Sequence, residues 1–147
     1  MLIRPATLAD IPTIMALVTE ARSAAQWPLE HYDQAINNSY PRRVMLVMVD
    51  QTIQAFLVGK VVAGEWELEN VAVSANFRRK GIGSIILKEF LQIVRQEKSH
   101  AVFLEVRESN QGARHFYEKF GFEKTGRRLS YYANPEEDAI VYRLVIS

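Results

Sequence analysis

Cysteine is absent from this chain of 147 residues. Its absence excludes disulfide bonds, thiolate metal sites and a cysteine nucleophile, and it is typical of proteins in a reducing compartment. Long apolar runs are also missing. No stretch approaches the roughly 18 apolar residues of a membrane helix, and the N-terminus has no apolar segment of signal-peptide length. We therefore expect a cytoplasmic protein that does not bind a membrane.

The chain also lacks an excess of positive charge. It has 18 Lys and Arg against 17 Asp and Glu, a formal net charge of +1. Nucleic-acid-binding domains usually carry a larger basic excess, so no nucleic-acid partner is expected. His31, His100 and His115 have no spacing typical of metal ligands, and no metal site is predicted. Without a repeat or linker, residues 1–147 are expected to form a single domain.

Changes in hydrophobic period along the chain predict seven strands and four helices. The expected strands cover residues 1–4, 44–49, 53–62, 65–73, 101–106, 122–128 and 139–146, and the expected helices residues 11–22, 29–36, 82–98 and 110–120. The strand-helix-strand unit over residues 71–106 predicts a parallel pair, and the hairpins predict antiparallel pairs. The expected fold class is α/β with a mixed sheet. Its order is β-α-α-β-β-β-α-β-α-β-β, with a central parallel strand pair and helices on both faces.

A basic, glycine-containing loop precedes the long helix, with the sequence Arg78-Arg79-Lys80-Gly81-Ile82-Gly83-Ser84. Its glycines allow a tight turn, and the N–H groups at a helix start suit a phosphate. The loop is not a dinucleotide-binding turn, because Ile86 replaces the third glycine, and no P-loop motif occurs. Another phosphate-bearing ligand is therefore expected. The alternative is a plain turn beside solvated basic residues.

Two motifs resemble signatures of the GCN5-related N-acetyltransferase (GNAT) superfamily. They are Asn70-Val71-Ala72-Val73 followed by Arg78-x-x-Gly81-x-Gly83, and Asn110-x-x-Ala113-x-x-x-Tyr117-x-x-x-Gly121-Phe122. Within this superfamily, two further segments are similar to the ribosomal-protein-alanine N-acetyltransferases: Leu104-Glu105-Val106-Arg107 and Gly126-x-Arg128-x-x-Tyr131-Tyr132. Trp27-Pro28 departs from the Pro-Trp-Ser tripeptide of that group.

The resemblance implies an enzyme that transfers the acetyl group of acetyl-CoA to a primary amine. Because no cysteine can carry the acetyl group, the amine is expected to attack directly. The implied acceptor is a protein N-terminal α-amine, such as the alanine terminus of a ribosomal protein. An α-amine (pKa about 7.7–8.0) is partly neutral at physiological pH, whereas lysine (about 10.4) is not.

The resemblance also implies where the cofactor lies. The pantetheine arm is expected along residues 71–73, and the pyrophosphate on backbone N–H groups of residues 79–84. Val73 or a neighbour is a candidate oxyanion donor. The expected cofactor-binding residues are Val71, Ala72, Val73, Arg78, Arg79, Lys80, Gly81, Ile82, Gly83, Ser84, Asn110 and Tyr117. For Asn110, a second role as helix cap is compatible with this one.

Two residues are candidate catalysts. Tyr117 is the candidate general acid for the leaving thiolate, and the alternative is a core aromatic in a helical stripe. Glu105 is the candidate general base, because burial in an apolar strand would raise the pKa of its carboxyl group toward neutrality. The alternative is an ion pair with Arg107, two residues along on the same face of the strand, which would lower that pKa.

Other residues are expected on the acceptor side. Glu67 and Glu69 share a strand face and are rival bases, and Tyr131 and Tyr132 are expected to shape the acceptor groove. Two other functions stay open, a small-molecule N-acetyltransferase and a non-catalytic acyl-CoA-binding module. The sequence does not distinguish a monomer from a homodimer.

Overall fold

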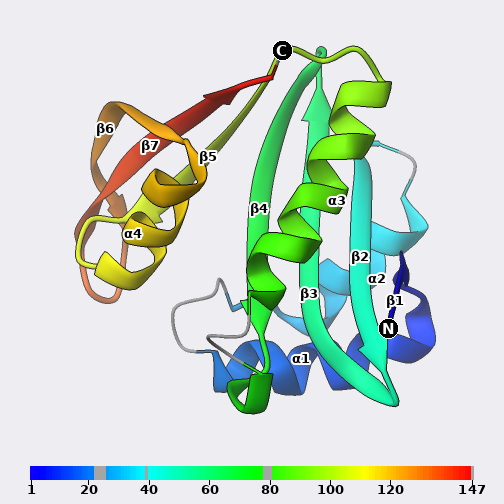
Figure 1. The fold of residues 1–147 in the computed structure, drawn as a ribbon. Helices are drawn as coiled ribbons and strands as arrows, with labels where there is room; N and C mark the ends of the chain where they lie inside the picture. The colour runs from blue at the N-terminus through cyan, green and yellow to red at the C-terminus, as the bar shows by residue number, and fades with distance from the viewer. Residues whose placement is uncertain (22–25, 39, 78–80, 147) are drawn as a thin grey trace.

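The structure is a computed structural model that describes residues 1–21, 26–38, 40–77 and 81–146 (Figure 1). Its elements follow the expected order, with two additional 3₁₀ turns at Leu8–Asp10 and Ala75–Phe77. The strands are β1 (Leu2–Pro5), β2 (Arg42–Asp50), β3 (Thr52–Val62), β4 (Glu65–Val73), β5 (Ala101–Arg107), β6 (Glu123–Tyr132) and β7 (Glu137–Val145). The helices are α1 (Ile11–Glu20), α2 (Leu29–Asn37), α3 (Ile82–Gln96) and α4 (Gln111–Phe120).

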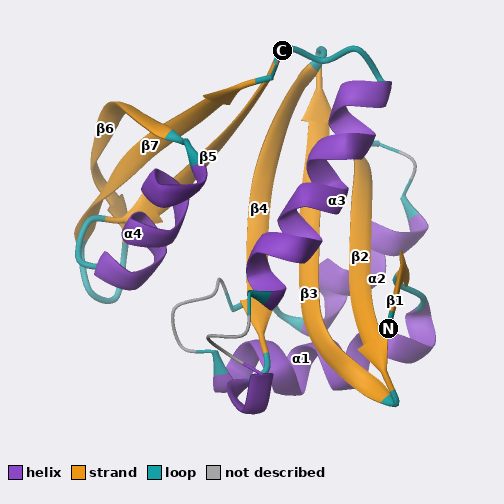
Figure 2. Cartoon of the chain, in the orientation of Figure 1, coloured by secondary structure: helices purple, strands orange, loops and turns teal. Residues whose placement is uncertain are grey.

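All the strands belong to one sheet in the order β1-β2-β3-β4-β5-β7-β6. Among the described strands, β4 and β5 pair in parallel, and the other neighbouring pairs are antiparallel. Helices α3 and α4 pack on one face, and α1 and α2 on the other (Figure 2). The predicted mixed sheet with a central parallel pair and helices on both faces is confirmed.

The parallel pair is short, and its two strands separate toward their C-terminal ends (Figure 1). They are in register only at Trp66↔Val102 and Glu67↔Phe103. On the other side of β4, the register with β3 shifts because Val58 faces Asn70 while Gly59 faces Leu68. Glu69 is thus an extra residue, a bulge that bends the strand. The bend begins just where the pairing of β4 with β5 ends.

A buried aromatic pair holds the closed end of the two strands. The ring of Trp66 meets that of Phe90 on α3 edge to face, with centroids 5.6 Å apart. The Trp66 indole donates from Nε1 to Ser99 Oγ over 3.1 Å. Gly59 makes room for this packing, since a Cβ there would lie 2.5 Å from Phe90 Cζ. Close packing therefore fixes the point from which β4 and β5 diverge.

The buried face of α3 differs from the predicted one. Helical spacing in the sequence predicts one apolar face with Ile82, Ile85, Ile86, Phe90 and Ile93, but Ile85 is 40% exposed. The buried side chains instead follow rows with helical spacing of four: Ile82, Ile86, Phe90 and Val94, with Leu87 and Leu91. The helix face that packs against the sheet is thus the side with Leu87, and Ile85 lies at the edge of this face.

Strand β6 is longer than predicted, because it continues past Arg128 to Tyr132. Its register with β7 shifts twice, between Lys124 and Gly126 and between Arg128 and Tyr132. The backbone N–H of Ser130 donates to Asp138 Oδ1 over 2.8 Å, which anchors the second irregularity. The bulges allow β6 to bend without ending.

None of the helices in the described ranges combines the length and apolar character needed to cross a bilayer.

Candidate active site

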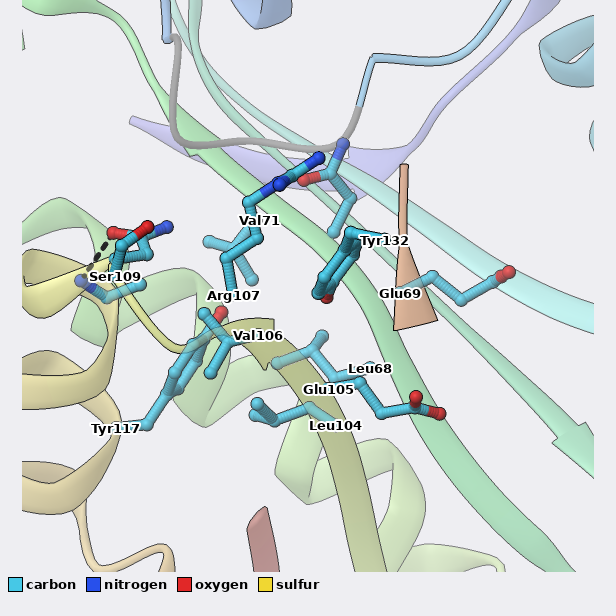
Figure 3. A pocket seen from close by; sticks show the side chains of 13 residues that line it. Leu68, Glu69, Val71, Leu104, Glu105, Val106, Arg107, Ser109, Tyr117 and Tyr132 are labelled. Atoms are coloured by element: carbon cyan, nitrogen blue, oxygen red, sulfur yellow. Dashed lines mark hydrogen bonds between the residues drawn. The ribbon is translucent and has the colours of Figure 1, made fainter. Parts of the chain in front are cut away.

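The separation of β4 and β5 opens a cavity of about 440 Å³ (Figure 3). It is bounded by both strands, by the start of α4 and by the end of β6. Its lining consists of Leu68, Glu69, Asn70, Val71, Leu104, Glu105, Val106, Arg107, Ser109, Asn110, Ala113, Tyr117 and Tyr132. Of the residues expected from the sequence to bind cofactor, bind acceptor or catalyse, this lining contains Glu69, Val71, Glu105, Asn110, Tyr117 and Tyr132. It does not contain Glu67, Val73 or Tyr131. Ala72, by contrast, is buried in the core beneath α1 and α2.

The start of α3 lies close to the end of β4. Gly81 caps the helix with φ at +75°, a left-handed conformation that favours glycine. A Cβ at Gly83 would lie 3.5 Å from Phe116 on α4 and 3.7 Å from Val73 on β4. The first-turn N–H groups of α3 have no acceptor within the helix. Arg78, Arg79 and Lys80 lie outside the described residues.

These features fit an acyl-CoA ligand. The cavity between the strands has room for a thioester arm, and the helix start beside it offers N–H donors for a diphosphate. Asn110 caps α4 as expected, since its Oδ1 accepts from the Ala113 N–H over 3.2 Å.

Glu105 lies on the face of β5 opposite Leu104 and Val106, and its side chain is 10% exposed. Its Oε2 is buried 3.1 Å from Arg128 Nε, in an ion pair, and accepts no hydrogen bond from any described residue. The alternative predicted from the sequence, an ion pair between Glu105 and Arg107, is wrong because Arg107 has another partner. At the end of β5 it reaches the β6–β7 turn, where it pairs with Glu137 at 3.1 Å.

Tyr117 reaches the cavity from α4, on the other side of β5 from Glu105 (Figure 3). Its ring packs against Phe116 and Phe122, with centroids 5.2 and 5.5 Å apart. The side chain thus packs against the core and also lines the cavity, so its core position is compatible with the predicted role as general acid. Its hydroxyl group forms no hydrogen bond within the described ranges. Burial raises the pKa of the Tyr117 phenol, and the nearby Tyr132 adds to this shift.

Cations on β2 and β3 balance the negative charges of Glu67 and Glu69 on β4. Arg43 on β2 donates from Nε to Glu69 Oε1 over 2.9 Å. Lys60 on β3 lies 3.6 Å from Glu67 and 3.8 Å from Glu69. Burial raises the pKa of Glu67, and the negative charges of Glu69 and Glu105 add to the rise. The positive charge of Lys60 lowers this pKa but does not cancel the rise. Glu67 is therefore a second carboxyl group on β4 whose charge is coupled to that of Glu105.

The two predicted acceptor-side tyrosines flank these carboxyl groups. Tyr132 lines the cavity, and Tyr131 meets it at right angles with centroids 5.1 Å apart. The Arg107 guanidinium lies 4.5 Å from the Tyr132 ring centre, and that of Arg128 lies 5.7 Å from Tyr131. Burial, together with the charge of Glu105, raises the pKa of Tyr132 to about 12 and that of Tyr131 in the same direction. Both phenols thus remain protonated donors at neutral pH.

Sequence reasoning missed the basic partners of this site. Arg43 lies 26 residues from Glu69, so nothing local pointed to it. Lys60 is the register partner of Glu67 across the β3–β4 hairpin, which was an available local signal. Arg128 did belong to the quoted Gly126-x-Arg128-x-x-Tyr131-Tyr132 segment, which was the available signal. His31 stacks on Trp27 at 3.9 Å, and burial with the charge of Arg43 lowers its pKa. No cluster of three potential metal ligands occurs in the part of the chain described.

Known proteins share both the sequence pattern and the fold. A family model described as the acetyltransferase (GNAT) family matches residues 11–122. Ribosomal protein bS18-alanine N-acetyltransferase of Salmonella typhimurium is 37% identical over 100 residues, which cover 67% of this chain and 68% of that relative.

Solved structures extend the similarity over almost the whole chain. The ribosomal-protein-S18-alanine N-acetyltransferase from Escherichia coli superposes with a TM-score of 0.84 at 26% identity, covering 99% of this chain and 94% of that one. Arabidopsis thaliana NAA60, crystallised with a bisubstrate analogue, shares the fold with a TM-score of 0.87 at 16% identity, covering 99% and 98% of the two chains.

The family inferred from the sequence motifs is thus confirmed, and with it the expected chemistry of the chain. The protein belongs to the GNAT family of acetyltransferases and is an N-acetyltransferase whose acetyl donor is acetyl-CoA.

Proposed function

We propose that this enzyme acetylates the N-terminal α-amine of a polypeptide in the cytoplasm, and that its acceptor is the alanine terminus of a ribosomal protein. The names of the similar bacterial enzymes support this acceptor. The observation that carries the proposal is Glu105: a carboxylate with one buried oxygen that accepts no hydrogen bond from a described residue, at the cavity between β4 and β5. We also propose that residues 1–147 form one domain, since a single sheet includes all their strands.

The cofactor is proposed to bind where the parallel strands separate. Its pantetheine arm would follow residues 71–73 of β4, with Ala72 contributing backbone only because its side chain is in the core. Its diphosphate would bind the N–H groups of residues 82–84 and the adjoining residues 79–81, with Arg78 beside them, and Asn110 would line the arm. When bound, acetyl-CoA supplies a thioester-linked acetyl group and a thiol leaving group.

Glu105 is proposed to take the proton of the acceptor amine. Its carboxylate lies at the cavity between β4 and β5, and Arg128 holds it in place through an ion pair of 3.1 Å. Glu67 adds negative charge from β4, and together the two carboxyl groups would attract an α-ammonium ion into the site. Because an α-amine has a reference pKa of about 7.7–8.0, removing its proton near neutral pH is a small uphill step.

Tyr117 is proposed to hold the proton needed by the leaving thiol. Since burial raises the pKa of its phenol, Tyr117 stays protonated throughout the neutral range. The same burial disfavours the charged thiolate of CoA and so makes its sulfur more basic. A more basic sulfur would favour transfer of the phenol proton from Tyr117 to the leaving thiolate. Packing against Phe116 and Phe122 fixes the hydroxyl group in the cavity.

The proposed acceptor is tested with a panel of amines and intact-mass analysis. With acetyl-CoA present, an alanine-initiated peptide should gain one acetyl group at its α-amine. The same peptide with a blocked terminus and an internal lysine should react at least about 10-fold more slowly, because lysine is almost fully protonated near pH 7. Faster acetylation of lysine or of a polyamine would refute the proposed acceptor.

Replacing Glu105 tests the base. In Glu105→Gln, kcat should fall by about 10²- to 10⁴-fold, the usual contribution of a general base, while the affinity for CoA is retained. The matched variant Glu67→Gln should lower kcat much less, and Glu123→Gln, at an exposed site on β6, serves as the control. If Glu67→Gln abolished turnover and Glu105→Gln did not, the base would be Glu67.

Replacing Tyr117 tests the acid. Tyr117→Phe should lower kcat by about 10²-fold or more because the proton donor is lost. Its melting temperature should match that of the wild type, since the ring contacts remain and the hydroxyl group has no partner among the described residues. Tyr40→Phe changes an exposed tyrosine and provides the control. Unchanged turnover in Tyr117→Phe would show that another group protonates the thiolate.

A further inference from the structure

One half of the sheet has a face that no described helix covers. Helices α1 and α2 pack against β2, β3 and β4, and their core cluster contains no residue of β5, β6 or β7. Helix α4 lies on the opposite face of β5 and β7 (Figure 1). The uncovered face therefore presents every second residue of β5 and β7, including Phe103 and Glu105, and their register partners Arg143 and Val141.

This face contains a second cavity, of about 470 Å³. Phe103 and Val141 are half-buried and form its apolar floor, while longer polar side chains form its walls. The full lining is Gly64, Glu65, His100, Ala101, Phe103, Thr125, Arg128, Val141 and Arg143. We refer to these nine residues as the β5–β7 groove.

The β5–β7 groove begins beside the proposed base. Arg128 lines it and lies 3.1 Å from Glu105. Phe103 precedes Glu105 by two residues and so lies on the same face of β5. From Glu105 to Ala101 the strand advances about 13 Å, at roughly 3.3 Å per residue, which is the length of about four extended residues of another chain.

The chemistry of the groove suits a peptide backbone. Arg128 and Arg143 are hydrogen-bond donors, whereas the Thr125 hydroxyl group already donates to the Val141 carbonyl over 3.4 Å. Glu65 is the one carboxylate of the lining. The Arg143 guanidinium forms no ion pair or hydrogen bond with any described residue. Donors of this kind bind carbonyl oxygens, and the apolar floor can pack against a side chain. A polyamine would instead place its further cationic groups next to Arg128 and Arg143, which is unfavourable.

We propose that the β5–β7 groove binds the residues that follow the N-terminal residue of a polypeptide acceptor. Arg143 would bond their backbone carbonyl groups, and Phe103 and Val141 would contact a side chain. The inference rests on the proposed function, because it places the amine at Glu105, and it specifies the acceptor as an extended chain of about four or more residues.

The test measures kcat/KM for alanine-initiated peptides of two to six residues, all with amidated C-termini so that no terminal carboxylate contacts an arginine. In the wild type, kcat/KM should rise with length by about 10-fold or more, the equivalent of one charge-assisted hydrogen bond. In Arg143→Ala, the ratio of the six-residue to the two-residue peptide should fall below about 3-fold. Arg95→Ala, on α3, should keep the wild-type ratio, and melting curves check that both variants fold.

The outcomes separate the two proposals. If the dipeptide is acetylated at its α-amine but kcat/KM does not change with length, the groove proposal is overturned and the proposed function stands. If length matters equally in the wild type and in Arg143→Ala, the role of Arg143 and of this groove is likewise overturned. If no peptide is acetylated while small amines are, both proposals fail.

Discussion

The short parallel pairing of β4 with β5 is the constraint on which the rest of this structure depends. Two registered pairs hold the strands at one end, and the bulge at Glu69 bends β4 where those pairs stop. Packing of Trp66 on Phe90 fixes the closed end. Without this divergence the strands would pair throughout, and the cavity between Val71 and Glu105 would not exist. A local loss of strand pairing thus creates the cavity in which we propose that acetyl-CoA binds.

The site also requires charge balance between separate parts of the chain. Glu67, Glu69 and Glu105 lie close to one another with little exposure, and unpaired carboxylates in such a place would be costly. Lys60, Arg43 and Arg128 compensate them from β3, β2 and β6. The near-zero net charge of the whole chain therefore conceals a local arrangement in which acidic groups gather beside the cavity and cations pair with them.

Much of the fold could be predicted because its signals are local. Changes in hydrophobic period marked every strand and helix, and Gly81 and Asn110 marked two helix starts. The partner of Glu105 could not be predicted in this way. Spacing within β5 favoured Arg107, whereas the bulges of β6 bring Arg128 to Glu105 from more than twenty residues away. Register shifts of this kind depend on the assembled sheet, as does the stripe of α3 that left Ile85 exposed.

The most direct test of this account is a crystal structure of the protein with CoA bound. The account predicts that the sulfur lies in the cavity between β4 and β5, beside the Tyr117 hydroxyl group, with the diphosphate at the start of α3. It also predicts that the two strands stay separated. A structure in which CoA binds elsewhere, or in which side chains fill this cavity while CoA is bound, would contradict it.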